Sequence, residues 1–122
     1  MMDKWQTIHN FWSGFDIPAY DESSVPDNAV MPYITYSALT SSFENTVLFT
    51  ADLWYHSTSW RDISLKAEEI SVALKGYTLQ PIGSNEYLML AQGSPFAQRM
   101  ADENDAVKRI HINVMGEFFT HN

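Results

Sequence analysis

The chain has 122 residues, 45% of them hydrophobic, and no cysteine, so we expect one domain over residues 1–122 with neither disulfides nor thiolate metal sites. Its formal net charge is −8, which argues against a groove that grips nucleic acid, because such grooves neutralise phosphates with Lys and Arg. No stretch approaches the roughly 20 apolar residues of a membrane-spanning helix, and the N-terminus lacks the apolar run of a secretory signal.

The first part of the chain predicts a helix, a loop and a strand. Residues 3–13 predict a short helix that ends near Gly14. Its apolar face is expected to consist of Trp5, Ile8, Trp12 and Phe15, which follow helical spacing. Residues 16–31 are rich in proline, aspartate and asparagine and predict a loop. Residues 32–39 are β-branched and aromatic, which predicts a strand.

A second strand is predicted over residues 46–56, after a turn at 40–45. Apolar and polar side chains alternate along it, so one of its faces should be buried. Trp54 falls on the other, more polar face, where it could lie under a helix or at a protein contact. The sequence leaves these two alternatives open.

Residues 60–75 form the clearest predicted helix. Ser59 is expected to cap its start and Gly76 to end it. The apolar residues step by three and four positions and form one stripe: Trp60, Ile63, Ala67, Ile70 and Leu74. This stripe should face the core of the protein.

Three more strands are predicted, over residues 78–82, 86–91 and 106–118, with a polar irregular segment over 93–105. The expected element order is therefore α-β-β-α-β-β-β. The fold class that follows is α+β, with a mainly antiparallel sheet of about five strands packed on a central helix plus an N-terminal helix.

No arrangement of residues predicts a catalytic, cofactor-binding or metal site. The chain has no nucleophile elbow and no glycine-rich phosphate loop. The acidic residues of 102–105 lack the ligand spacing of a calcium loop. The four histidines, His9, His56, His111 and His121, lack zinc spacing, although His56 and His111 could meet across the sheet. We expect no enzyme and no cofactor; a small hydrolase or ligand-binding domain that uses His111 is the alternative.

The outer face of the 60–75 helix carries a candidate subunit contact. Leu65 and Val72 are seven positions apart and share a face, about 180° from the stripe of Ile63 and Ile70. The complete predicted interface consists of Leu65 and Val72, the charged residues Arg61, Glu68 and Glu69 around them, and Trp54. An apolar spot rimmed by charge favours a protein contact, whereas single exposed apolar residues are ordinary.

Several segments resemble one family of phage proteins. The segment from Phe15 to Tyr36 reads FDIPAYDESSVPDNAVMPYITY. It is similar to the opening of the tail-terminator, or tail-completion, proteins of siphophages, which are encoded in the head–tail joining region. Residues 49–57, 60–76 and 96–112 resemble the family's second strand, its central helix, and its final loop and strand. The resemblance spans nearly the whole chain.

The resemblance implies a structural virion protein, assembled in the cytoplasm of the host bacterium. Such a protein forms a hexameric ring that ends the tail tube and joins it to the neck below the head. The implied partners are further copies of the chain, the major tail-tube protein and neck or connector proteins, whereas DNA only passes through the lumen and no membrane is involved. Another head–tail connector or stopper protein is the close alternative.

Two features of the residues agree with a ring. Six copies would carry six times −8, or −48 charges, and an acidic conduit repels passing DNA. Long hairpin strands also offer edges that a neighbouring copy can extend, and head-to-tail contacts of that kind can close into a ring.

Overall fold

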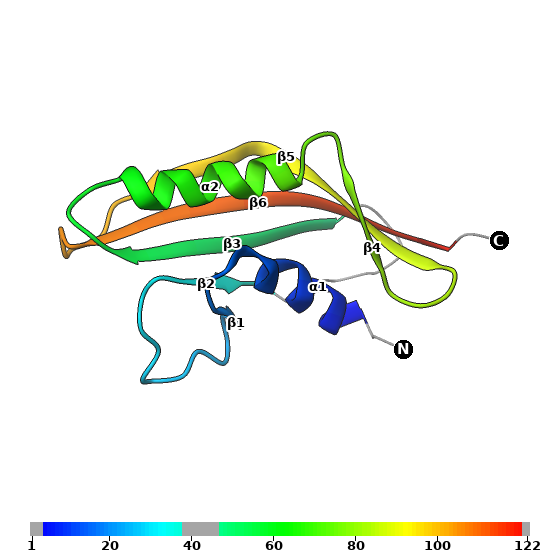
Figure 1. Cartoon of the computed structure of the whole chain (residues 1–122), viewed down its shortest axis with the longest axis horizontal. Helices are drawn as coiled ribbons and strands as arrows, with labels where there is room; N and C mark the ends of the chain where they lie inside the picture. The colour runs from blue at the N-terminus through cyan, green and yellow to red at the C-terminus, as the bar shows by residue number, and fades with distance from the viewer. Residues whose placement is uncertain (1–3, 38–46, 121–122) are drawn as a thin grey trace.

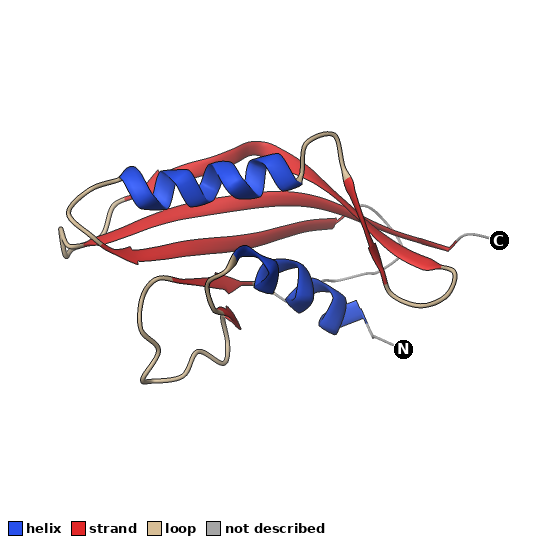
Figure 2. Ribbon diagram, in the orientation of Figure 1, coloured by secondary structure: helices blue, strands red, loops and turns tan. Residues whose placement is uncertain are grey.

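The computed structural model describes residues 4–37 and 47–120, so the turn predicted at 40–45 lies outside the described residues. A six-stranded sheet in the order β1-β2-β3-β6-β5-β4 carries the helices (Figure 1). The strands are β1 (Ala19–Asp21), β2 (Tyr33–Tyr36), β3 (Val47–His56), β4 (Thr78–Pro81), β5 (Glu86–Met100) and β6 (Val107–Thr120), and the helices are α1 (Lys4–Trp12), the 3₁₀ turn η1 (Ser13–Phe15) and α2 (Arg61–Ala73) (Figure 2). The predicted α+β class is confirmed.

The sheet is antiparallel except at one edge. β3 pairs with β6 from Val47 opposite Gly116 to His56 opposite Val107, and β2–β3, β5–β6 and β4–β5 are also antiparallel. β1 runs parallel to β2 inside the segment that the sequence predicts to be a loop. This strand was missed because it has only three residues, too few to show an alternating pattern among the surrounding turn formers.

β5 is longer than predicted, because the irregular segment expected over 93–105 is a strand as far as Met100. Its glycine and proline lie in a bulge, where the register with β6 shifts between Gln92 and Ala97. Gly93 approaches the β6 backbone so closely that a Cβ there would lie 2.8 Å from the carbonyl oxygen of Asn113. The Asn113 amide in turn donates to the Pro95 carbonyl at 3.0 Å. The turn-forming residues therefore bend a strand instead of ending it.

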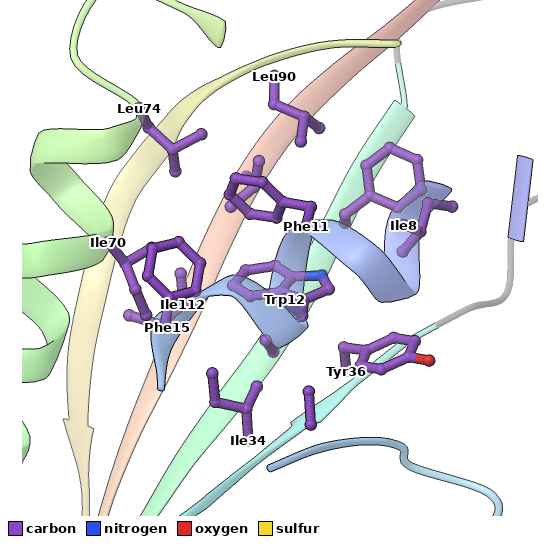
Figure 3. Close-up of a cluster of buried hydrophobic side chains, with 14 of the residues drawn as sticks. Ile8, Phe11, Trp12, Phe15, Ile34, Tyr36, Ile70, Leu74, Leu90 and Ile112 are labelled. Carbon is purple, nitrogen blue, oxygen red and sulfur yellow. The ribbon is translucent and has the colours of Figure 1, made fainter. Parts of the chain in front are cut away.

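The core lies between the helices and one face of the sheet, called here the covered face. α1 and η1 bury Ile8, Phe11, Trp12 and Phe15, and these side chains form one cluster with Ile70 and Leu74 of α2, in which Phe15 lies next to Ile70 (Figure 3). The prediction of Trp5 as a core residue is wrong, since it is 44% exposed. The stripe is centred on Ile8, Phe11 and Trp12, and Trp5 lies at its edge in the first helical turn.

α2 buries the predicted stripe from Ile63 to Leu74, while Trp60 precedes the helix and is only partly buried. The N-cap residue of α2 is Trp60, which makes no side-chain capping hydrogen bond, so the predicted cap at Ser59 is one residue too early. The Ser59 hydroxyl accepts a hydrogen bond from the Arg61 amide at 3.0 Å in the turn before the helix. Gly76 follows the helix with a φ of 75°, the conformation that ends helices. Neither described helix is long and apolar enough to cross a membrane.

The second face of the sheet carries neither helix and is called here the open face. Alternate residues of β3 and β6 point to it, because their neighbours Leu53, Ile110 and Ile112 are buried on the covered face. The described surface available for partners therefore includes two opposite sides: the outer side of α2 and the open face of the sheet.

Candidate assembly surfaces

The outer side of α2 presents the predicted apolar pair to solvent. Leu65 is 52% exposed and Val72 is 72% exposed. Arg61, Glu68 and Glu69 are exposed around them, so five of the six predicted interface residues share one surface. We call this set, together with Lys75 in the turn after the helix, the helix surface.

Trp54 does not belong to the helix surface. It lies on the open face, on the other side of the sheet from α2, so the alternative that placed it under the helix is wrong, while its place in a protein contact stays a prediction. Its indole nitrogen donates to the Thr35 hydroxyl at 2.9 Å, and the Arg109 guanidinium lies 4.9 Å from the centre of its ring. Trp54 is therefore held in place and half-buried by neighbours of its own chain.

A carboxylate cluster lies next to Trp54 on the open face. Asp52 is only 8% exposed and sits opposite His111 in the β3–β6 register. One of its oxygens accepts from Arg109 Nε at 3.1 Å and lies 2.9 Å from His111 Nδ1. The Arg109 cation neutralises this buried charge, so the cluster fixes side chains that bridge β3 and β6.

The surroundings of His111 do not form a hydrolytic triad. The Asp52 oxygen that contacts the imidazole also accepts a hydrogen bond from Arg109. The nearby Thr35 hydroxyl accepts a hydrogen bond from the Trp54 indole. A triad needs a hydroxyl or thiol nucleophile bonded to the second ring nitrogen. Within the described part of the chain, the hydrogen bond of His111 is the one to Asp52.

The other histidines are apart from one another. His56 pairs with Val107, four residues along the strand from the pair of Asp52 and His111. The prediction that His56 and His111 could meet across the sheet is therefore wrong. His9 Nδ1 bonds to the Tyr36 hydroxyl at 2.7 Å, and His121 lies outside the described residues. Among residues 4–37 and 47–120, no group of His, Asp and Glu is placed to hold a metal ion.

The acidic segment 102–105 forms the tip between β5 and β6. The side chains of Asp102 and Asn104 accept hydrogen bonds from the backbone amides two residues on, which are turn interactions. A cavity of about 210 Å³ beside the tip is lined partly by Trp60 and Lys108. It is smaller than the roughly 300–1,000 Å³ of small-molecule sites.

One apolar surface was missed by the sequence analysis. We call it the sheet patch; it lies on the open face and consists of Leu48, Leu79, Tyr87, Met89, Met115 and Phe119. Four of these side chains are 39–59% exposed: Leu48, Leu79, Met115 and Phe119. The signal in the sequence is that β6 after Val114 carries apolar side chains on both faces, with Glu117 as the exception, but only the strand register shows that four strands contribute to one patch.

Comparison with known proteins yields a likeness of structure. No protein-family model matches the chain, and no curated protein matches it by sequence. A chain in the solved structure described as "Virion of native gene transfer agent (GTA) particle" has a similar fold, with a TM-score of 0.65 and 13% sequence identity. The alignment covers 95% of this chain and 94% of that chain, so the shared fold takes in nearly all of both.

Proposed function

We propose that this chain is a structural virion protein that forms a ring, six copies in number, at the end of a phage tail tube and joins the tail to the neck. The observation that carries the proposal is the shared fold with a chain of a gene transfer agent virion, over nearly the full length of both chains. The resemblance of four segments to siphophage tail terminators points the same way. Both likenesses extend over the whole arrangement of helices and strands instead of one local motif.

The surfaces support an assembly role. Exposed apolar side chains gather on two opposite sides of the molecule, the helix surface and the sheet patch. Contiguous exposed apolar surface is typical of protein–protein contacts. A subunit with two different contact surfaces can bind one neighbour through each of them, and head-to-tail contacts of this kind can close into a ring.

The polar groups of the open face support a structural role over a catalytic one. Asp52 is occupied by Arg109 and His111, and the Trp54 indole by Thr35. Catalytic groups must be available to a substrate, whereas these side chains bond to one another. The net charge of −8 also suits a conduit through which DNA passes without adhering.

The test is assembly with tail tubes. The purified chain is added to polymerising tail-tube protein from the same phage, and tube lengths and ends are observed by negative-stain electron microscopy. We expect shorter tubes with a cap at one end, and a hexameric mass by light scattering for the cap. Tubes of unchanged length together with a chain that stays monomeric would refute the proposal.

A matched pair of variants makes the test specific. Leu65→Asp with Val72→Asp places charge on the helix surface and should abolish capping. Val30→Asp alters an equally exposed apolar side chain, 78% exposed in the loop before β2, and should leave capping unchanged. If the variant with both Leu65→Asp and Val72→Asp caps tubes as well as the wild type does, the helix surface is not part of the interface.

The close alternative is another neck component, a connector or a stopper. It predicts that the chain binds the portal or neck proteins but leaves tube growth unaffected. Pull-down against each partner separately therefore distinguishes the two roles.

A further inference from the structure

The sheet patch is built from three rows of residues that the strand register places side by side. The first row is Leu48, Met115 and Ala91; the second is Glu117, Met89 and Leu79; the third is Phe119, Tyr87 and Pro81. The rings of Tyr87 and Phe119 stack with centroids 5.8 Å apart, which fixes them on the same face. Within these three rows Glu117 is the one ionisable group that carries a charge at neutral pH.

The dimensions of the sheet patch are those of the centre of an interface. Four strands at about 4.8 Å spacing span roughly 14 Å, and the five residues from Met115 to Phe119, four steps of about 3.3 Å, span about 13 Å along β6. The projected area is therefore on the order of 200 Å², against about 800 Å² per partner for a stable interface. A stable contact therefore needs a larger polar rim around the patch, since the apolar centre of an interface is generally surrounded by polar residues.

The helix surface has features that match the sheet patch. Leu65 and Val72 are separated by about 10 Å along the helix, since each residue rises about 1.5 Å, so both fit within the length of the patch. Lys75 is exposed and follows Val72 by three positions, close to one helical turn. It supplies a cation next to the apolar pair, and Glu117 supplies an anion within the patch.

Two copies joined patch to patch would bury two Glu117 carboxylates on apolar surface with no cation in the three rows to pair with them, which is unfavourable. The helix surface carries carboxylates of its own, Glu68 and Glu69, in the middle of α2 and the cation Lys75 after its C-terminal end. The favourable orientation of patch against helix surface is therefore the one that sets Lys75 beside Glu117. Because the two surfaces lie on opposite sides of one molecule, this contact leaves a free helix surface and a free patch on each pair. It can therefore repeat from copy to copy.

We infer that the sheet patch of one copy receives the helix surface of the next copy, with Leu65 and Val72 packed on the methionines of the patch and Lys75 beside Glu117. This inference rests on the proposed function, because it names the contact by which the ring would close.

The chain has no cysteine, so engineered cysteines can report the contact without background. Val72→Cys marks the helix surface, Met115→Cys marks the sheet patch, and a short bismaleimide crosslinks neighbouring thiols. The double variant should give a ladder of crosslinked species up to the hexamer. Each single variant alone should give none, and a mixture of the two singles should give dimers and nothing larger. Val30→Cys combined with Met115→Cys is the matched control and should give no ladder.

The outcomes separate this contact from the proposed function. Dimers from one single variant alone would show a contact between like surfaces and overturn the inference. A double variant that gives no ladder, although light scattering finds a hexamer of the wild type, would also overturn the inference. The proposed ring would not be refuted by that result. A wild type that stays monomeric, alone and on tail tubes, would refute both.

A charge exchange provides an independent readout. Glu117→Lys should abolish hexamer formation, because it faces Lys75 of the next copy. Adding Lys75→Glu should restore the hexamer, since the pair is then reversed. Failure of the second change to restore assembly, with circular dichroism showing a folded chain, would overturn the inference.

Discussion

Gly116 offers a sharp test of packing in the core, because the ring of Phe49 lies directly over it. A Cβ at this position would be 2.4 Å from Phe49 Cε2 and 2.8 Å from Cδ2. Carbon atoms rest about 3.5–4.0 Å apart, so Gly116→Ala must push the ring away by about 1 Å. The ring has little room to move, since Phe49 is 2% exposed and packs edge-on against Phe118 with centroids 6.2 Å apart.

The expected loss of stability has two contributions. Overpacking of a core costs about 1–3 kcal/mol, and the reduced freedom of the unfolded chain after Gly→Ala returns about 0.4–1 kcal/mol. We therefore expect Gly116→Ala to lower the free energy of unfolding by about 1–2 kcal/mol. Urea denaturation followed by far-UV circular dichroism measures this difference.

Two further variants make the result decisive. Gly14→Ala adds a methyl group with nothing within 4 Å, so it keeps the unfolded-chain contribution without a clash and should raise the free energy of unfolding by about 0.4–1 kcal/mol. Phe49→Leu combined with Gly116→Ala should cost less than the sum of the single changes, because the clash is relieved. If Gly116→Ala unfolds at the same urea concentration as the wild type, the reasoning about a confined ring is refuted.

Three other predictions follow from the core, the open face and the ionisable tyrosines. Ile70→Ala removes a fully buried contact between α2 and the sheet and should cost about 2–5 kcal/mol in urea denaturation; a loss below this range would contradict the packing. Asp52→Asn removes the anion that binds Arg109 and should cost about 1–2 kcal/mol, because Arg109 keeps access to water; the cost should be smaller in an Arg109→Met background, where the contact with His111 is the one left to lose. Burial first, and two nearby carboxylates second, raise the pKa of Tyr55 above 10.0 in the folded protein, so its contribution to stability is complete below about pH 10 and is lost as the pH rises through the folded pKa. Tyr55→Phe should therefore flatten the fall of the urea midpoint at alkaline pH, and an unchanged slope would assign that fall to other groups.

The sequence alone determined the elements whose periodicity is long enough to read. The stripe of Ile63, Ala67, Ile70 and Leu74 identified both α2 and its buried side, and it thereby placed Leu65 and Val72 on the surface. Alternation along β3 identified its buried face in the same way. A helix or strand of ten or more residues repeats its pattern several times, so local sequence suffices to show which side faces the core.

Only the tertiary structure decided which residues come together from distant parts of the chain. β3 lies beside β6, whose residues follow it by more than fifty positions, and that pairing places Asp52 against His111 and Leu48 beside Met115. The bulge at Gly93 and the three-residue β1 are likewise stabilised by partners in other strands. Strand register depends on how the whole sheet packs under its helices, and local periodicity contains no information about it. For that reason the helix surface was visible in the sequence, while the sheet patch was not.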